Sequence, residues 1–411
     1  MFRRYALAAL IAAALACVVP GIPTPGGGET ELQTRVAATL TALAMSPATS
    51  APPTETAPPP VTATPEAPPI LPFPLYFLAD RTGSFQIWRV AVDGVTLTQI
   101  TAEPGSVGWF DVSPADGTLA YVSGNELILA DAEGGNRRVL VTGAPLAPEQ
   151  DESYWAQEIS DPAWSPDGAQ LAYGLNGLNL HTISSGATVT VLANQLPTEE
   201  DPASIRLYRP SLWSPDGSKL LAQVSFYEAG SLVIVPASGG PPLSTTIPDG
   251  IVCCQPAWSS DGLSIFLAND SVGLLSPGLW RIDAGTGVGA TLIGGDDGSG
   301  TLNFVGWPKQ GPDGRLLYFF GQTATFPERG TWPTSMVVSD ADGVTGRTPL
   351  RSDSYIAAEA LWAPDASLAV ISDFSVLSSA FPPIGPLRLL RADAGPAVTL
   401  ADQGRNLRWG R

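Results

Sequence analysis

The chain has 411 residues, 44% of them hydrophobic, so it is too long for one small domain and can bury a large core. Only 15% of the residues are charged and the net charge is −18, which excludes nucleic acid as an expected partner because an acidic surface repels phosphates. Glycine and proline are abundant, at 43 and 40 residues, which favours short strands joined by turns over long helices. Of the three cysteines two are adjacent, so no long-range disulfide framework holds the fold.

Residues 1–16 have the features of a signal peptide. Arg3 and Arg4 supply the positive charge, and the apolar run that follows is too short to cross a bilayer core of about 30 Å. Small residues precede Cys17, an arrangement that resembles a bacterial lipobox, although Leu15 departs from its usual order. The resemblance implies that Cys17 is lipidated, so that an exported lipoprotein is anchored on the extracellular or periplasmic side of a membrane. Secretion without lipid and retention by an uncleaved leader are the open alternatives.

A stalk is predicted over residues 17–74. Residues 29–45 can form a short helix, because Leu32, Val36, Leu40 and Leu43 share one helical face. Residues 46–74 are rich in proline, threonine and alanine and cannot bury enough apolar surface to fold, so we expect them to be disordered.

A pattern related to W-S-P-D-G recurs from residue 75 onward. The clearest copies are PAWSPDGAQLAYG (162–174), SLWSPDGSKLLAQ (211–223) and PAWSSDGLSIFLA (256–268). Their spacing of 45–49 residues is typical of a propeller. The tryptophan is predicted to end an inner strand, and S-P-D-G to form a tight turn in which aspartate bonds nearby backbone and glycine takes a positive φ. The signature residues are Trp164, Asp167, Gly168, Trp213, Asp216, Gly217, Trp258, Asp261, Gly262, Trp307, Asp313, Gly314, Trp362, Asp365 and Trp409.

Three further copies are irregular. The copy at 305–320 has an insertion before its P-D-G, the copy at 360–372 has Ala366 in place of the glycine, and the copy at 110–123 has Val112 in place of the tryptophan. Two more predicted strands follow each copy, so the repeating unit is a four-stranded antiparallel blade.

The two ends of this region complement each other. Residues 75–80, 85–91 and 96–101 have the pattern of a blade that lacks its first strand, and 406–411 (NLRWGR) that of an inner strand with no blade after it. We therefore predict an all-β fold, with a β-propeller of seven four-stranded blades over 75–411 closed by the C-terminal strand. Six blades is the alternative, if the copy at 107–143 is not a full blade.

The repeat resembles that of TolB-like propellers and is similar to the N-terminal propeller of prolyl oligopeptidase and dipeptidyl peptidase families. This resemblance covers residues 75–411 and implies a periplasmic interaction scaffold. TolB-like propellers normally have six blades, so the predicted count departs from the family. The peptidases carry a separate hydrolase domain, and we expect none here because the repeats reach residue 411.

No catalytic residue is predicted. The sequence has no G-x-S-x-G elbow, and its single histidine, His181, lies in a predicted strand as an exposed residue. The acidic turns at Asp296-Asp297 and Asp340-Asp342 are explained by turn chemistry and lack the ligand spacing of a calcium loop. We expect no cofactor, with a structural calcium ion in the channel as the open alternative.

Two features are candidates for ligand recognition. Cys253 and Cys254 form either a vicinal disulfide or two reduced thiols. Two long segments precede inner strands, so both should lie on the same face, where propeller ligands commonly bind. Their candidate residues are Glu149, Asp151, Glu152, Tyr154, Trp155, Glu199, Glu200, Asp201 and Arg206.

Two functional hypotheses follow. The first is a monomeric, non-enzymatic scaffold that presents one loop face to a cell-envelope protein or a glycan. The second is a glycan hydrolase or lyase that uses carboxylates facing the channel. An enzyme should bring two or three carboxylates together in the channel mouth, whereas a scaffold should have none there.

Overall fold

The part of the chain that the structure describes begins just before the predicted propeller. The computed structural model describes residues 69–146, 152–198, 200–201, 204–226, 230–247, 256–272, 277–296, 298–327, 331–374 and 384–411. The predicted signal peptide, Cys17, the helix at 29–45 and the stalk up to residue 68 lie outside the described residues. Packing already begins at Leu71, which is buried against the first and last sheets.

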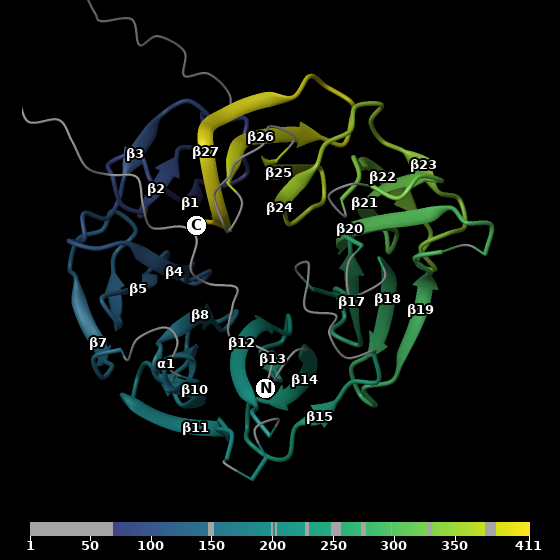
Figure 1. Ribbon diagram of the computed structural model, residues 1–411. Coiled ribbons are helices and arrows are strands. Elements are labelled where there is room, and N and C mark those ends of the chain that lie inside the picture. Colours follow the sequence, from purple (N-terminus) through teal and green to yellow (C-terminus); the bar gives the residue numbers. More distant parts are fainter. Residues whose placement is uncertain are drawn as a thin grey trace, which may run out of the picture. The chain divides into compact units, whose positions relative to one another are not determined.

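The strands form sheets that stand around a ring (Figure 1). Antiparallel neighbours pair in chain order, so each unit runs from an inner strand outward. The inner strands are β4 (Val107–Val112), β8 (Ser160–Trp164), β12 (Leu207–Trp213), β16 (Ala257–Trp258), β20 (Leu302–Gln310), β24 (Ala357–Trp362) and the second half of β27 (Val398–Trp409).

The middle two strands of each blade are the most deeply buried. The second strands are β1 (Leu75–Ala79), β5 (Leu119–Ser123), β9 (Gln170–Gly174), β13 (Lys219–Ser225), β17 (Ser264–Asn269), β21 (Leu316–Thr323) and β25 (Leu368–Asp373). The third strands are β2 (Gln86–Val90), β6 (Glu126–Ala130), β10 (Gly177–Thr182), β14 (Gly230–Pro236), β18 (Gly278–Asp283), β22 (Ser335–Ser339) and β26 (Gly385–Arg391).

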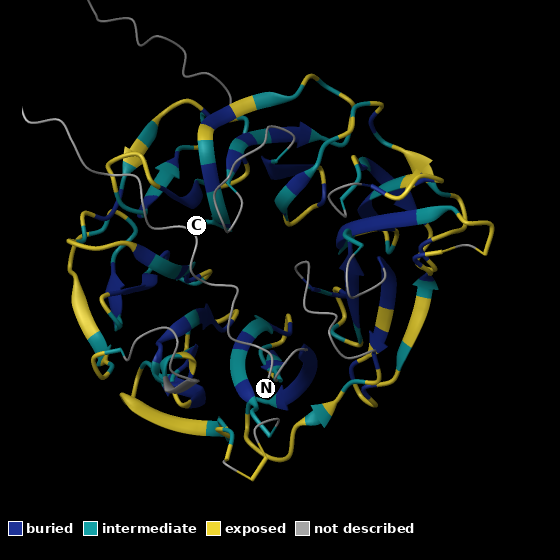
Figure 2. Ribbon diagram, viewed as in Figure 1, coloured by how far each residue is buried: buried dark blue, intermediate teal, exposed yellow. Residues whose placement is uncertain are grey.

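The outer strands are short or exposed. They are β3 (Leu97–Gln99), β7 (Arg138–Thr142), β11 (Ala187–Ala193), β15 (Leu243–Ser244), β19 (Gly289–Ile293), β23 (Thr348–Pro349) and the first half of β27. Figure 2 shows these outer edges as largely exposed and the inner strands as buried or intermediate.

Strand β27 closes the ring. Its first half pairs with β26, where Leu389 lies opposite Val398, and its second half pairs with β1, where Leu75 lies opposite Trp409. The last and first blades therefore join into one seven-stranded sheet. The predicted completion of the N-terminal blade by residues near the C-terminus is confirmed.

The hydrophobic core consists of separate clusters that lie between neighbouring blades. Within the described residues, seven buried clusters each combine side chains from two neighbouring sheets, including one between the last and first blades. The irregular copy at 107–143 forms a complete four-stranded sheet, β4 to β7, which removes the condition on which the six-blade alternative depended. The pairing is therefore consistent with seven blades.

The signature turn has the predicted chemistry. Ser165 Oγ donates to Asp167 Oδ1 at 2.6 Å, the same Oδ1 accepts the Ala169 N–H at 3.0 Å, and Gly168 takes φ +69°. The same serine-to-aspartate bond, also 2.6 Å, recurs at Ser214–Asp216 and Ser259–Asp261. The aspartate of each turn thus accepts hydrogen bonds from donors that have no partner in the hairpin ladder.

The signature tryptophans connect neighbouring blades. Four of them donate the indole N–H to an inner-strand carbonyl of the preceding blade: Trp213 to Ala163 at 3.0 Å, Trp258 to Leu212 at 3.2 Å, Trp362 to Trp307 at 2.7 Å and Trp409 to Trp362 at 2.8 Å. Each bond contributes about 1 kcal/mol to the free energy of unfolding, in addition to the contribution from burial of the indole ring, and restricts the angle between two sheets.

The irregular copies keep the same geometry at some cost. Ala366 adopts φ +60° in place of the usual glycine, a conformation that strains a residue with a Cβ atom. The insertion after Trp307 is accommodated by a register shift between Gly306 and Lys309, with Trp307 itself at φ +48°.

Candidate functional site

A cluster of charged side chains lies on the inner strands and beside them, at the inner edge of the ring. We call it the axial cluster: Asp111, Glu158, Asp161, Arg209, Glu359, Arg405 and Arg408. Register shifts interrupt the pairing of β4, β8, β12, β24 and the second half of β27 beside these residues. Such bulges re-aim side chains and are common next to functional sites.

Asp111 joins three blades. Its Oδ2 accepts the backbone N–H of Trp164 at 2.7 Å, and its Oδ1 lies 3.1 Å from Nε of Arg408. Trp164 belongs to the next blade and Arg408 to the closing strand, so this carboxylate is held from both sides.

Glu359 holds the closing strand from the other side. Its carboxylate accepts the backbone N–H groups of Asn406 at 2.5 Å and Leu407 at 2.8 Å, and lies 4.0 Å from Nη1 of Arg408. Asp111 and Glu359 therefore share Arg408 between them, and both connect inner strands of adjacent blades.

Arg209 gathers the other two carboxylates. Its Nη2 lies 3.3 Å from Oε2 of Glu158, and its Nη1 lies 3.7 Å from Oδ2 of Asp161. The ring of Trp155, which is 42% exposed, lies 6.0 Å from this guanidinium. Trp155 sits on the short helix α1 (Glu152–Gln157), so the loop before β8 brings an exposed aromatic ring to the axial cluster.

A pocket of about 320 Å³ opens onto the axial cluster. It is lined by Leu78, Gly108, Trp109, Asp161, Ala358, Glu359, Ser372, Arg405 and Asn406, which come from four successive blades; we call it the axial pocket. A second pocket of about 320 Å³, the side pocket, shares Gly108 and Trp109 with it and also contacts Glu158 and Asn125. Together the two pockets combine charged groups with the apolar wall of Trp109.

Burial shifts the protonation of this cluster. It raises the pKa of Asp111, Asp161 and Glu359, against the lowering effect of Arg408 or Arg209, and it raises the pKa of Glu158. Burial lowers the pKa of Arg405, which Glu359 partly opposes. The surroundings therefore disfavour unpaired charge, and a ligand group that pairs with one of these side chains gains more there than on the open surface.

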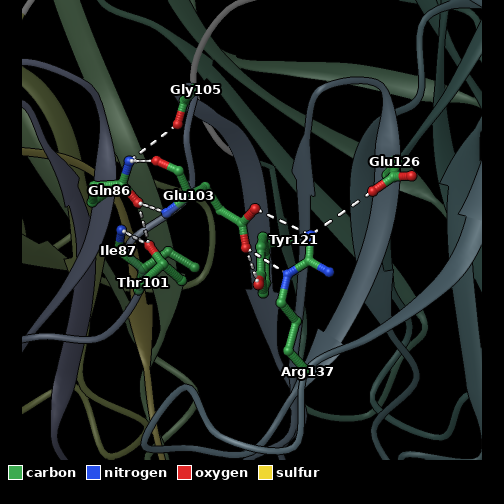
Figure 3. Close-up of polar contacts among 8 residues, drawn as sticks. All are labelled: Gln86, Ile87, Thr101, Glu103, Gly105, Tyr121, Glu126 and Arg137. Carbon is green, nitrogen blue, oxygen red and sulfur yellow. Dashed lines mark hydrogen bonds and ion pairs between the residues drawn. The ribbon is translucent and has the colours of Figure 1, made fainter.

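A polar network fixes the connection that leads into β4 (Figure 3). Glu103 accepts hydrogen bonds from Tyr121 Oη at 2.7 Å and from Arg137 Nε at 2.8 Å, and Gln86 Nε2 donates to the carbonyls of Glu103 and Gly105 at 3.2 and 3.1 Å. The arginine beside Glu103 holds the pKa of this carboxyl below its usual range. The network thus positions Ser106 and Gly108, which line the pockets.

Of the residues predicted to take part in ligand recognition, some reach the axial cluster and others do not. Cys253, Cys254, Glu149, Asp151 and Glu199 lie outside the described residues, and Glu152 begins α1. Tyr154 Oη donates to Glu158 at 3.2 Å and its ring meets Trp155 edge-on, so these two residues reach the axial cluster. Glu200 and Asp201 are exposed, and the guanidinium of Arg206 lies 4.3 Å from the ring of Phe226.

Two expectations were wrong. His181 was predicted to be an exposed strand residue, but it is buried and its Nδ1 lies 2.9 Å from Thr188 Oγ1, because successive residues of β10, which face opposite sides of the sheet, are all buried from Gly177 to His181. A scaffold was expected to bring no carboxylates together at the inner edge of the ring, but the axial cluster has several, which is the arrangement expected of the enzyme alternative. These carboxylates could not be predicted, because they lie between the signature tryptophans, where the residue type varies from copy to copy.

Within the described part of the chain, no group of three or more His, Cys, Asp or Glu side chains is arranged to hold a metal ion. Asp296 and Asp342 instead accept hydrogen bonds from the backbone of their own turns. Over the same residues, no helix has the length and apolar character needed to span a bilayer.

No protein-family profile matches the chain. An uncharacterized protein of Agrobacterium fabrum is 32% identical over 113 aligned residues, which cover 24% of this chain and 35% of that protein. The chain thus spans about a third of the length of this curated relative.

Two of the similar solved structures cover about four fifths of this chain. TolB from Acinetobacter baumannii is 16% identical, covers 82% of both chains and has a TM-score of 0.41. A puromycin-hydrolyzing peptidase from Mycobacterium tuberculosis is 12% identical, covers 80% of this chain and 53% of that chain, and has a TM-score of 0.50. At 12% identity the likeness to this peptidase is one of fold alone.

Proposed function

We propose that the protein is an exported, non-enzymatic binding propeller that takes a cell-envelope protein or glycan over the face bearing the axial and side pockets. The leader with Cys17 supports export and a lipid anchor. The two adjoining pockets, the shared wall of Trp109 and the exposed ring of Trp155 support this face as the binding surface.

The state of the carboxylates carries the proposal. Asp111 and Glu359 accept backbone N–H groups, and Glu158 is hydrogen-bonded by Tyr154 and lies 3.3 Å from Arg209. A general acid or base must be within reach of the proton it transfers and free to change charge. Side chains committed to contacts between blades are better suited to holding the ring together and presenting a charged surface.

A second candidate function has one observation in its favour. Burial raises the pKa of several carboxylates at one pocket, which is also a feature of acid catalysts in glycan-cleaving enzymes. That function predicts a glycan product, and the binding function predicts a stable complex, so the same purified protein distinguishes the two.

The experiment captures cell-envelope extract on immobilised full-length protein, with a glycan array and a product assay in parallel. We expect retention of one macromolecule, weakened by Trp155→Ala. The matched control is Leu263→Ala, another exposed apolar residue, 65% exposed, in a signature turn. Because strands alternate in direction, that turn lies at the opposite end of its blade. Glycan cleavage by the wild-type protein would instead establish the enzyme.

The lipid anchor has a separate test. Cys17→Ser is expected to move the protein from the membrane fraction to the soluble exported fraction, because no acyl chain can then be attached. An unchanged membrane fraction would refute lipidation at this residue.

A further inference from the structure

Two residues of opposite charge that line the axial pocket, Asp161 and Arg405, each have one buried polar atom without a hydrogen-bond partner among the described residues. Oδ2 of Asp161 accepts no hydrogen bond, and its ion-pair partner Arg209 lies 3.7 Å away. Nε of Arg405 donates none, and its guanidinium lies over the ring of Phe85 at 4.2 Å. Buried polar groups are nearly always satisfied, so each of these atoms requires an explanation.

The other carboxylates at this site differ in this respect. Glu359 also lines the axial pocket, but it accepts two backbone N–H groups from the closing strand. Asp111 accepts one and pairs with Arg408. Asp161 and Arg405 are therefore the residues that line the axial pocket and also keep a buried polar atom without a hydrogen-bond partner among the described residues.

The backbone around the pocket is also unusual. Asp161 has φ +48° and Asn406 has φ +54°, both in the left-handed region, and both residues line the pocket. Each stands three residues before a signature tryptophan, Trp164 or Trp409. Strained non-glycine residues persist where the surrounding structure enforces them, and they gather at binding sites.

We infer that the axial pocket binds a small zwitterion, such as a free amino acid or a dipeptide, with its ammonium group on Asp161 and its carboxylate on Arg405. The inference rests on the proposed function, since it names a ligand chemistry for the same face. The apolar body of the ligand would lie against Leu78 and Trp109.

Charge and size favour this class over others. A purely cationic ligand would leave Arg405 unsatisfied, and a purely anionic one would leave Asp161 unsatisfied and approach a protein of net charge −18. A volume of about 320 Å³ is at the small end of ligand pockets, which suits one or two amino-acid residues.

Titration calorimetry with full-length protein tests the inference. The ligands are alanine, the dipeptide Ala-Ala, its N-acetyl form and its C-terminal amide. We expect the zwitterions to bind and each blocked form to bind about 10- to 100-fold more weakly, since each loses one charge-assisted hydrogen bond. Comparing alanine with Ala-Ala shows whether a free amino acid or a peptide is preferred. Blocked ligands need no variant, so this comparison does not depend on a mutant's folding.

Two variants locate the site. Asp161→Asn keeps a residue type that tolerates a left-handed backbone, and Arg405→Gln removes the guanidinium; each should weaken zwitterion binding about 10-fold or more. Arg347→Gln is the matched control, because Arg347 also lies over a phenylalanine ring, at 3.8 Å, but does not line the pocket. Absence of zwitterion binding at millimolar ligand, equal binding of blocked forms, or unchanged affinity in both pocket variants would overturn the inference.

Failure here can be separated from failure of the proposed function. The same variants are used to capture cell-envelope extract. If a macromolecule is retained while no zwitterion binds, the pocket chemistry is wrong and the binding scaffold stands. If a zwitterion binds and no macromolecule is retained, the small-ligand site stands without the scaffold.

Discussion

The glycines of the signature turn allow a prediction whose size can be worked out from the structure. Gly168 and Gly217 both have φ +69°. A methyl group added to Gly217 would meet its nearest neighbour at 3.6 Å, an ordinary contact. A methyl group added to Gly168 would lie 2.7 Å from Cβ of Ala115 and 3.0 Å from Oγ of Ser113, in the adjacent blade. The two positions therefore share backbone strain and differ in crowding.

The expected costs follow from these contacts. Alanine at the left-handed φ costs about 1–2 kcal/mol, of which about 0.4–1 kcal/mol is offset by the lower entropy of the unfolded chain. Gly217→Ala should thus lower the free energy of unfolding by about 1 kcal/mol. Gly168→Ala adds overpacking of about 1–3 kcal/mol, for a total of about 2–4 kcal/mol.

Urea unfolding of the two variants and the wild-type protein, followed by tryptophan fluorescence, measures the difference. In a heat denaturation, a unit of this size has an unfolding entropy of about 0.7 kcal/mol/K, so an extra 2 kcal/mol lowers Tm by about 3 °C. Equal unfolding midpoints for the two variants would refute the argument, because backbone strain alone would then explain both and the contact between blades would be wrong.

Three further predictions concern ring closure, the signature tryptophans and pH. Leu407→Ala empties a fully buried site between the last and first blades and should cost about 2–5 kcal/mol in urea unfolding, whereas Leu263→Ala should change little; similar midpoints would contradict closure by β27. Trp213→Phe should cost about 1–3 kcal/mol more than Trp164→Phe, because the indole N–H of Trp213 donates to a carbonyl and that of Trp164 is unpaired; differential scanning calorimetry compares them. Asp216→Asn should lower the urea midpoint at pH 7, because the hydroxyl of its serine neighbour lowers the pKa of Asp216 to about 2. A carboxylate whose pKa is lowered in the folded state stabilises the fold at pH values above its unfolded pKa of about 3.9, and this stabilisation is lost as the pH falls. The difference in urea midpoint between wild type and Asp216→Asn should therefore shrink between pH 4 and pH 2. A difference that stays constant over this range would contradict the prediction.

The repeat pattern predicted most of the fold because each signature residue has one local role. The serine, aspartate and glycine of the turn, and the strand after it, follow from short-range chemistry that does not depend on the rest of the chain. Closure by the last strand could be predicted by counting strands, since the N-terminal blade lacks an inner strand and the C-terminal end of the repeat region has one strand too many. The clearest error in this part was His181, which was expected to be an exposed strand residue and is buried.

The axial cluster could not be predicted in the same way. Asp161 and Glu359 both stand three residues before a signature tryptophan, where other copies have Pro210 or Phe304, so no pattern marks them. The bulges beside them shift the pairing register, and strict alternation then assigns the wrong face. Tyr154 and Trp155 were found because a long acidic segment with aromatic residues is unusual, although the helix that carries them was not expected.

The division of β27 between two blades affects how the protein folds during its synthesis. Arg81 and Asp402, which form an ion pair beside this strand, are 321 residues apart. At a synthesis rate of about 5–20 residues per second, the second half of β27 is made roughly 15–65 s after β1, and the intervening blades are made during this interval. During that interval β1 presents an unpaired edge to any other extended chain. The five residues from Arg405 to Trp409 therefore determine when the nascent protein stops being a target for misassembly, and a delay at that point would expose the first blade rather than the last.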